Sequence, residues 1–305
     1  MAERQQLHLA DGRRLDYLEV GDPAGAPAVY LHGTPSSASE AGGSTGPPLN
    51  RACDSSRSTG PATSARSPRL DASLVGVAED VVSLARALRL GRFAVVGFSG
   101  GAPYALAAAH LAPAEVTVAH LGGGICSLAD AADYGLAWWR RLVFRLTARA
   151  PVVSVPLLGF MLGRVGRKLQ GRLGAPDEAA LELFEGAARG AQIAAVIEYV
   201  RSSDAEELRS EISDYIAATG ATGAVVADMA AVAMPWPFEL GSVVTPVEIW
   251  HGRDDPAVPV GFAEAMAASL PNGRAHLFEG EGHFVFHTHA DAVAASVREH
   301  AAITR

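Results

Sequence analysis

The sequence predicts an α/β fold in which a mostly parallel sheet is covered by helices on both faces. Short apolar segments rich in β-branched residues alternate with longer segments whose apolar residues recur at helical spacing, an order typical of parallel sheets. The chain has 305 residues, of which 49% are apolar and 19% are charged. A chain of this length and composition can bury a large core.

The elements begin with a hairpin and continue as strands and helices in turn. Residues 6–22 alternate apolar and polar side chains around Asp11-Gly12, which predicts two antiparallel strands. After this hairpin we expect strands over 27–33, 93–98 and 116–121, with helices over 74–90 and 102–111.

The pattern changes after residue 126. Residues 127–241 indicate several helices rich in alanine, leucine and aromatic residues, and strands return at 246–252 and 274–280, each followed by a helix. We therefore expect residues 1–126 and 242–305 to form one core. Residues 127–241 then form a helical cap, inserted after the sixth strand.

Composition and charge exclude several partner classes. The net charge of −8 argues against nucleic acid, which binds through clustered lysine and arginine. The polar amino-terminus does not resemble a signal peptide, and the apolar residues 151–163 are too few to span a bilayer. Two cysteines, Cys53 and Cys126, cannot form a disulfide framework. We expect a cytoplasmic protein without membrane insertion, and the sequence does not predict an oligomeric state.

A glycine-rich motif marks the turn after the strand at 93–98. Gly97-Phe98-Ser99-Gly100-Gly101 matches G-x-S-x-G, in which a serine nucleophile lies on a sharp strand-to-helix turn. Small residues flank such a serine because the strand and the helix pass close to each other there. The alternative is a glycine-rich turn whose serine only caps the helix.

A nucleophilic serine requires a base, and the base requires a carboxylate that orients it. Asp254 and Asp255 follow the strand at 246–252, and His283 follows the strand at 274–280, so the residues occur in the order Ser, Asp, His. His287 and His289 are rivals for the base. The Gly-Glu-Gly loop that precedes His283 favours His283.

These motifs resemble the α/β-hydrolase superfamily. The GFSGG turn, the pattern H-G-x-x-D at His251–Asp255 followed by Val258-Pro259, and the loop His32-Gly33-Thr34-Pro35 carry the resemblance, which covers residues 1–33, 74–126 and 242–305. The HGTP and GFSGG motifs are most similar to those of the capped serine esterases and of the branch that resembles proline iminopeptidases. The resemblance implies an α/β-hydrolase sheet and a triad of Ser99, Asp255 and His283, with Asp254 as the fallback acid.

The resemblance also implies an oxyanion hole. Its donors would be the backbone N–H groups of Thr34 and Gly100, while His32 and Gly33 would have a structural role beside the site. The sequence contains no His/Cys cluster with metal-ligand spacing, so we expect neither a metal nor an organic cofactor.

The expected activity is hydrolysis of a small carboxylic ester, or of a related acyl substrate, through an acyl-enzyme. Aromatic residues of the cap favour an apolar acyl or aryl group, although most of them could simply pack the cap helices. The alternative, an aminopeptidase of the proline-iminopeptidase type, needs acidic side chains for the substrate amine. Candidates are Glu182, Glu185, Asp204, Glu206 and Glu207.

Residues 34–73 depart from the family pattern. They contain no Val, Ile, Met, Phe, Tyr or Trp, so we expect an irregular or disordered segment where the family has a helix and a core strand between its second and third strands. Back-translating Asp54–Thr63 with GC-rich codons and reading from the third base gives L-V-A-L-D-R-P-G-Y, which matches that strand and its turn. We hypothesise that residues 42–66 are frame-shifted, which would leave the third strand without one neighbour and the chain inactive or non-catalytic.

Overall fold

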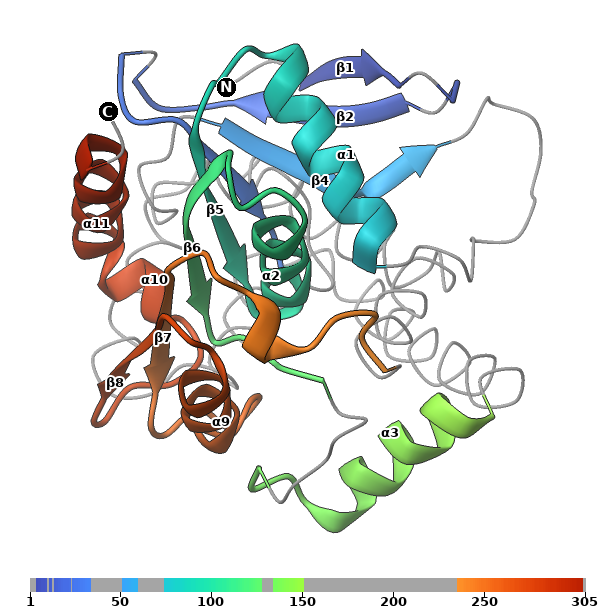
Figure 1. Ribbon diagram of the computed structural model, residues 1–305. Helices are drawn as coiled ribbons and strands as arrows, with labels where there is room; N and C mark the ends of the chain where they lie inside the picture. The colour runs from blue at the N-terminus through green and yellow to red at the C-terminus, as the bar shows by residue number, and fades with distance from the viewer. Residues whose placement is uncertain are drawn as a thin grey trace, which may run out of the picture.

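The computed structural model is built around one central sheet (Figure 1). It describes residues 4–9, 11, 12, 14–22, 24–33, 51–59, 74–127, 134–150 and 235–303. The described strands are β1 (Arg4–His8), β2 (Arg14–Glu19), β3 (Ala28–Leu31), β4 (Arg51–Thr59), β5 (Phe93–Phe98), β6 (Val116–Gly122), β7 (Val247–Gly252) and β8 (Gly273–Phe278).

Their order across the sheet is β1-β2-β4-β3-β5-β6-β7-β8. The pairs β1/β2 and β2/β4 are antiparallel, whereas every pairing from β4 through β3 to β8 is parallel. The predicted α/β class with a mostly parallel sheet is confirmed. Because parallel strands share one direction, the loops after β5, β7 and β8 leave the sheet at the same edge.

Helices cover both faces of the sheet, as predicted. The helices α1 (Leu74–Ala87), α2 (Ala102–Leu111) and α9 (Gly261–Ser269) contribute to one buried cluster, and α10 (Val285–Thr288) and α11 (Ala290–Ile303) contribute to a second. A further helix, α3 (Trp138–Arg149), lies away from the sheet (Figure 1). Short 3-10 turns occur at η2 (Ser99–Gly101) and η3 (Leu240–Ser242).

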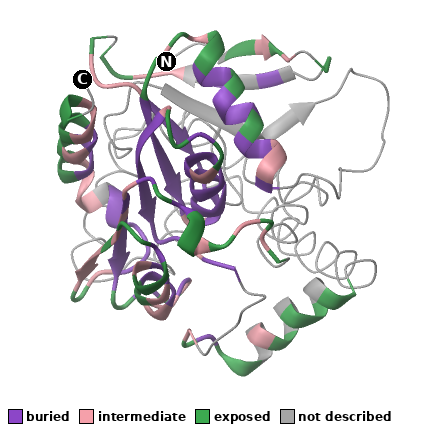
Figure 2. Cartoon of the chain, in the orientation of Figure 1, coloured by how far each residue is buried: buried purple, intermediate pink, exposed green. Residues whose placement is uncertain are grey.

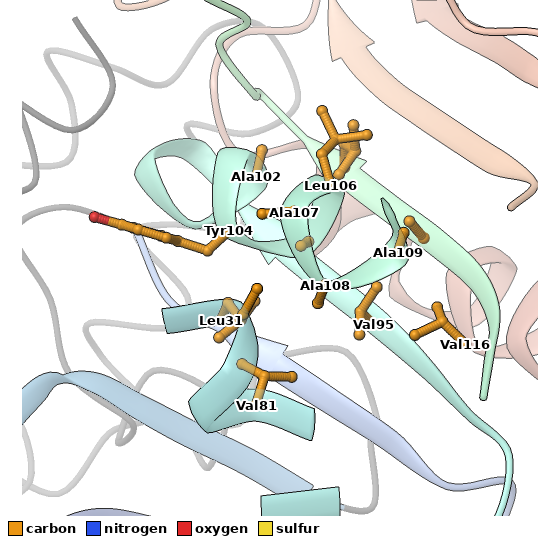
Figure 3. Packing of buried hydrophobic residues seen from close by; sticks show 14 of the residues in the cluster. Leu31, Val81, Val95, Ala102, Tyr104, Leu106, Ala107, Ala108, Ala109 and Val116 are labelled. Carbon is orange, nitrogen blue, oxygen red and sulfur yellow. The ribbon is translucent and has the colours of Figure 1, made fainter. Parts of the chain in front are cut away.

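The first cluster is built around α2, whose residues from Ala102 to Ala109 are all buried. Figure 3 shows this alanine-rich helix against Leu31 and Val95 of the sheet and Val81 of α1. Small side chains let the helix axis approach the sheet closely, so the serine turn that precedes α2 is fixed by dense packing. Figure 2 shows that α2 is mostly buried, whereas the described residues of α3 are mostly exposed.

Strand β4 lies inside the segment expected to be irregular. Its residues pair with β2 on one side and with β3 on the other, where Tyr30 is opposite Ala52 and Leu31 is opposite Cys53. The prediction of an irregular chain is therefore wrong for Arg51–Thr59, as is the expectation that the third strand lacks a neighbour. The reason is that strand pairing uses backbone N–H and C=O groups, which every non-proline residue carries. The other residues of 34–73 lie outside the described residues.

Candidate active site

Ser99 occupies a strained turn between β5 and α2. The strand ends at Phe98, η2 runs over Ser99–Gly101, and α2 begins at Ala102, which is the predicted strand-turn-helix order. The φ angle of Ser99 is 49°, in the left-handed region that residues other than glycine rarely adopt. Ser99 is half-buried, whereas Gly97, Gly100 and Gly101 around it are buried. Such strain at a partly accessible serine is typical of a nucleophile turn.

Two glycines permit this turn for steric reasons. A Cβ atom on Gly97 would lie 2.6 Å from the carbonyl oxygen of Gly101, and a Cβ on Gly101 would collide with the carbonyl oxygens of Leu31 and His32. The backbone around Ser99 therefore packs directly against the end of β3. A nucleophile-type turn explains both glycines, whereas a simple helix cap would require neither.

Asp255 is buried in the turn after β7. Its Oδ1 accepts hydrogen bonds from the backbone N–H groups of Ala257 at 2.7 Å and Val258 at 2.9 Å. Its Oδ2 lies 2.7 Å from Nδ1 of His283. The neighbouring Asp254, the fallback acid, is exposed, and its backbone N–H donates to the carbonyl of Glu281.

Charge and burial act in opposite directions on Asp255. Burial alone would raise the pKa of this carboxyl, but the hydrogen bond and charge of His283, with the backbone N–H of Val258, hold it below its usual value. Asp255 is therefore a carboxylate at neutral pH and can only accept hydrogen bonds. It follows that Nδ1 of His283 donates to Asp255, and that in the neutral imidazole the lone pair is on Nε2.

Contacts with the ends of β5 and β6 place His283 next to the serine turn. The His283 ring lies 5.1 Å, centroid to centroid, from the ring of Phe98, the residue before Ser99. A Cβ on Gly123, just after β6, would lie 2.9 Å from Nδ1 and Cε1 of His283. The structure thus gathers the ends of β5, β6 and β7 around one imidazole.

A second buried histidine, His251, lies on the other side of Asp255. Its Nε2 donates to the carbonyl of Val258 at 2.8 Å and lies 3.5 Å from Oδ2 of Asp255. Burial lowers the pKa of His251, so this ring is neutral, and its Nδ1 has no hydrogen-bond partner. The contact was not predicted from the sequence, where His251 is part of the H-G-x-x-D motif; its place four residues before Asp255 is the available signal.

The loop that carries His283 is held by Glu281, which sequence reasoning also missed. Glu281 accepts hydrogen bonds from Thr288 at 2.8 Å and from Nε2 of His289 at 2.9 Å. The His289 ring also stacks on Phe278, with centroids 3.7 Å apart. His289, one of the two rivals for the base, is therefore engaged in holding this loop.

The loop after β3 also lies next to the serine turn. His32 and Gly33 are buried, and Nδ1 of His32 lies 2.8 Å from the carbonyl oxygen of Gly33. A Cβ on Gly33 would lie 3.3 Å from the Cβ of Ser99. Gly100 is the second residue of the helical segment that starts at Ser99, where backbone N–H groups have no intrahelical partner.

Several predicted residues lie outside the described residues. These are Thr34, most of the cap, and the acidic residues Glu182, Glu185, Asp204, Glu206 and Glu207; for His287 only the backbone is described. Within the described residues, no group of three or more His, Cys, Asp or Glu side chains could hold a metal ion.

Solved structures share the fold of this chain at low sequence identity. An esterase from Exiguobacterium antarcticum is 18% identical with a TM-score of 0.64, over 98% of this chain and 99% of that chain. An alpha/beta hydrolase fold protein from Chitinophaga pinensis is 15% identical with a TM-score of 0.62, over 98% and 96% of the two chains. A thermophilic esterase from Thermogutta terrifontis is 17% identical with a TM-score of 0.58, over 99% of both.

No curated protein matches the sequence significantly. The model of the alpha/beta hydrolase fold family, in contrast, matches residues 50–290, which include the serine turn, the Asp255 turn and the His283 loop. This match extends over more than half of the chain. The chain therefore belongs to the alpha/beta hydrolase fold family.

Proposed function

We propose that this chain is a serine hydrolase that cleaves a small carboxylic ester, or a related acyl substrate, with Ser99, His283 and Asp255 as its triad. The observation that carries the proposal is the 2.7 Å hydrogen bond between His283 and the buried Asp255, beside a serine with a φ angle of 49°. Family membership supports a hydrolase, and two of the similar structures are esterases.

In the first half of the reaction, Ser99 Oγ attacks the ester carbonyl carbon. Nε2 of His283 accepts the hydroxyl proton, because Nδ1 already donates to Asp255. The negative charge that develops on the carbonyl oxygen is held by the N–H of Gly100 and, as the second proposed donor, by that of Thr34. When the tetrahedral intermediate collapses, the C–O bond to the alcohol breaks, and the alcohol leaves with the proton from His283.

In the second half, water repeats the same sequence. His283 takes a proton from water as the water oxygen attacks the acyl carbon, and it returns the proton to Ser99 Oγ when the acid leaves. Asp255 stabilises the imidazolium that forms in both halves. His283 and, to a smaller extent, the backbone N–H of Val258 keep Asp255 ionised, and the N–H groups of Ala257 and Val258 that bind Oδ1 hold it in place.

The test combines covalent labelling with hydrolysis. We expect a fluorophosphonate probe to label the wild-type protein and a panel of p-nitrophenyl esters to be hydrolysed. Ser99→Ala should abolish labelling and lower kcat by about 10⁶-fold. The matched control is Ser83→Ala, at an exposed serine of α1, which should behave as the wild type does.

Aminoacyl-naphthylamides belong in the same panel. Faster turnover of these amides than of the esters would move the proposal to an aminopeptidase. A folded protein that the probe does not label and that hydrolyses neither class would contradict a serine hydrolase and would favour a non-catalytic member of the family.

A further inference from the structure

Helix α3 (Trp138–Arg149) differs from every other described helix in its surface. The helices α1, α2, α9 and α11 each bury an apolar face against the sheet, whereas α3 lies apart from it, and its described residues are mostly exposed (Figures 1 and 2). An exposed helix normally presents polar residues to solvent. Helix α3 does not.

Two parallel rows of side chains run along its exposed surface. Trp138, Leu142 and Leu146 form an apolar row at four-residue spacing, with exposed fractions of 73%, 49% and 50%. Three positions after each of them is an arginine, so Arg141, Arg145 and Arg149 form a second row beside the first. Arg145 and Arg149 are exposed, and Arg141 is half-buried.

The charge of α3 is opposite to that of the chain. Its sequence, WWRRLVFRLTAR, contains four arginines and no acidic residue, while the whole chain carries a net charge of −8. A row of large apolar side chains next to a row of cations matches the boundary of an anionic bilayer, where acyl chains lie beneath phosphate groups. A second copy of the chain, which is acidic overall and offers the same cationic helix, is a poorer match to this surface.

The segment just before α3 packs against the start of α9. Tyr134, which precedes the helix, packs on Phe262 of α9 with ring centroids 4.7 Å apart. A Cβ on Gly261 would lie 2.8 Å from the carbonyl oxygen of Tyr134. The base of α3 is therefore fixed to the segment that follows the Asp255 turn.

We propose that the exposed surface of α3 binds the surface of a bilayer that contains anionic phospholipid. Trp138, Leu142 and Leu146 would enter the interface, and Arg145 and Arg149 would pair with lipid phosphates. None of the described helices is long and apolar enough to span a membrane, so the contact is one of a helix lying on the surface. The proposal does not depend on the proposed hydrolysis.

The test is co-sedimentation of the full-length Ser99→Ala protein with vesicles, which keeps hydrolysis out of the measurement. We expect binding to vesicles of phosphatidylglycerol mixed with phosphatidylcholine, weaker binding as salt is raised, and little binding to phosphatidylcholine alone. Arg149→Glu and Leu146→Glu should each lower the partition coefficient about tenfold or more. Their matched controls on the exposed side of α11, Arg298→Glu and Ile303→Glu, should leave it unchanged.

Three results would overturn the proposal. The protein could stay in the supernatant with anionic vesicles, it could bind phosphatidylcholine equally well, or the α11 controls could weaken binding as much as the α3 variants do. Size-exclusion chromatography adds a fourth. A dimer that Leu146→Glu converts to a monomer would make a second copy of the chain the occupant of this surface.

Discussion

Strands β5 and β6 differ from strand β4 in how apolar their sequences are. Every residue of β5 (FAVVGF) and of β6 (VTVAHLG) is buried, as parallel strands covered on both faces require. Strand β4, with the sequence RACDSSRST, occupies an equally internal position between β2 and β3 but has almost no apolar residue. The backbone partners of a strand thus fix its place, while apolar side chains make it recognisable and supply most of its stabilisation.

The largest expected effect is on catalysis, at the turn after β7. Asp255→Asn should lower kcat by about 10⁴-fold, because an amide cannot hold His283 in the tautomer and orientation that catalysis needs. The fold should persist, since the two side chains are nearly identical in shape. Asp254→Asn is the matched control and should leave kcat almost unchanged. Steady-state kinetics with a p-nitrophenyl ester decide the matter, and the opposite ranking of the two variants would make Asp254 the acid.

A second prediction concerns the polar interior of the β5–β8 half. His120 of β6 is fully buried and accepts a hydrogen bond from Trp250 Nε1 at 3.1 Å. Burial, with smaller contributions from the charges of His300 and His276, lowers the pKa of His120 to about 3. Below about pH 6.5, the unfolded chain binds a proton at this site that the folded chain excludes, so stability falls as the pH drops from about 6.5 to the folded pKa.

The loss from His120 amounts to roughly 4 kcal/mol over that interval. His120→Gln keeps an acceptor for Trp250 and removes the titration, so the variant should lose less stability between pH 7 and pH 4. Urea unfolding at a series of pH values measures the difference. Asp255 adds a separate loss at lower pH, because its depressed folded pKa gives stability that disappears as the pH falls through that value. Parallel curves for wild type and His120→Gln would contradict the prediction.

A third prediction concerns strand β4. Replacing residues 54–62 with L-V-A-L-D-R-P-G-Y gives β4 the apolar character of its neighbours and should raise the free energy of unfolding by about 3 kcal/mol, the value of burying one or two large aliphatic side chains. A replacement with the same nine residues in scrambled order is the control. A chimera no more stable than the wild type would show that β4 gains nothing from apolar residues, and equal stability of both chimeras would show that their order does not matter.

The origin of this segment has its own measurement. Sequencing the DNA for residues 42–66 tests the frame-shift hypothesis directly. Two compensating indels relative to an independent read of the gene would support it, and an in-frame read with ordinary codon usage would refute it.

The same contrast explains what the sequence could predict. Strands β5, β6 and β7 and the turn at Ser99 were predictable because burial imposes apolar runs and close packing imposes glycine at positions 97 and 101. Motif order and strand position predicted His283 and an acid at position 254 or 255, and the resemblance to the α/β-hydrolase pattern favoured Asp255. Strand β4 was not predictable, since backbone pairing leaves no apolar signal, and Glu281 was missed because a loop carboxylate looks like any solvated one.

The smallest effect in this series tests how the acid itself is held. His251 donates to the Val258 carbonyl, and the Val258 N–H donates to Asp255, so His251 acts as a positioning residue through that turn. His251→Phe keeps an aromatic ring but leaves a buried carbonyl without its donor, which typically costs about 1–3 kcal/mol. We expect part of this loss to appear as an approximately tenfold lower kcat with an unchanged KM. His251→Gln can place an amide N–H near the position of Nε2 and should recover most of kcat.

A purely structural role of His251 would give a different result. Destabilisation alone would lower the amount of folded enzyme, yet each remaining active site, counted by titration with the fluorophosphonate probe, would turn over at the wild-type rate. A kcat per titrated site that falls in the Phe variant and returns in the Gln variant therefore distinguishes positioning from folding. Because burial lowers the pKa of His251 and keeps its ring neutral, its loss should remove no ionisation from the pH profile of kcat near neutral pH.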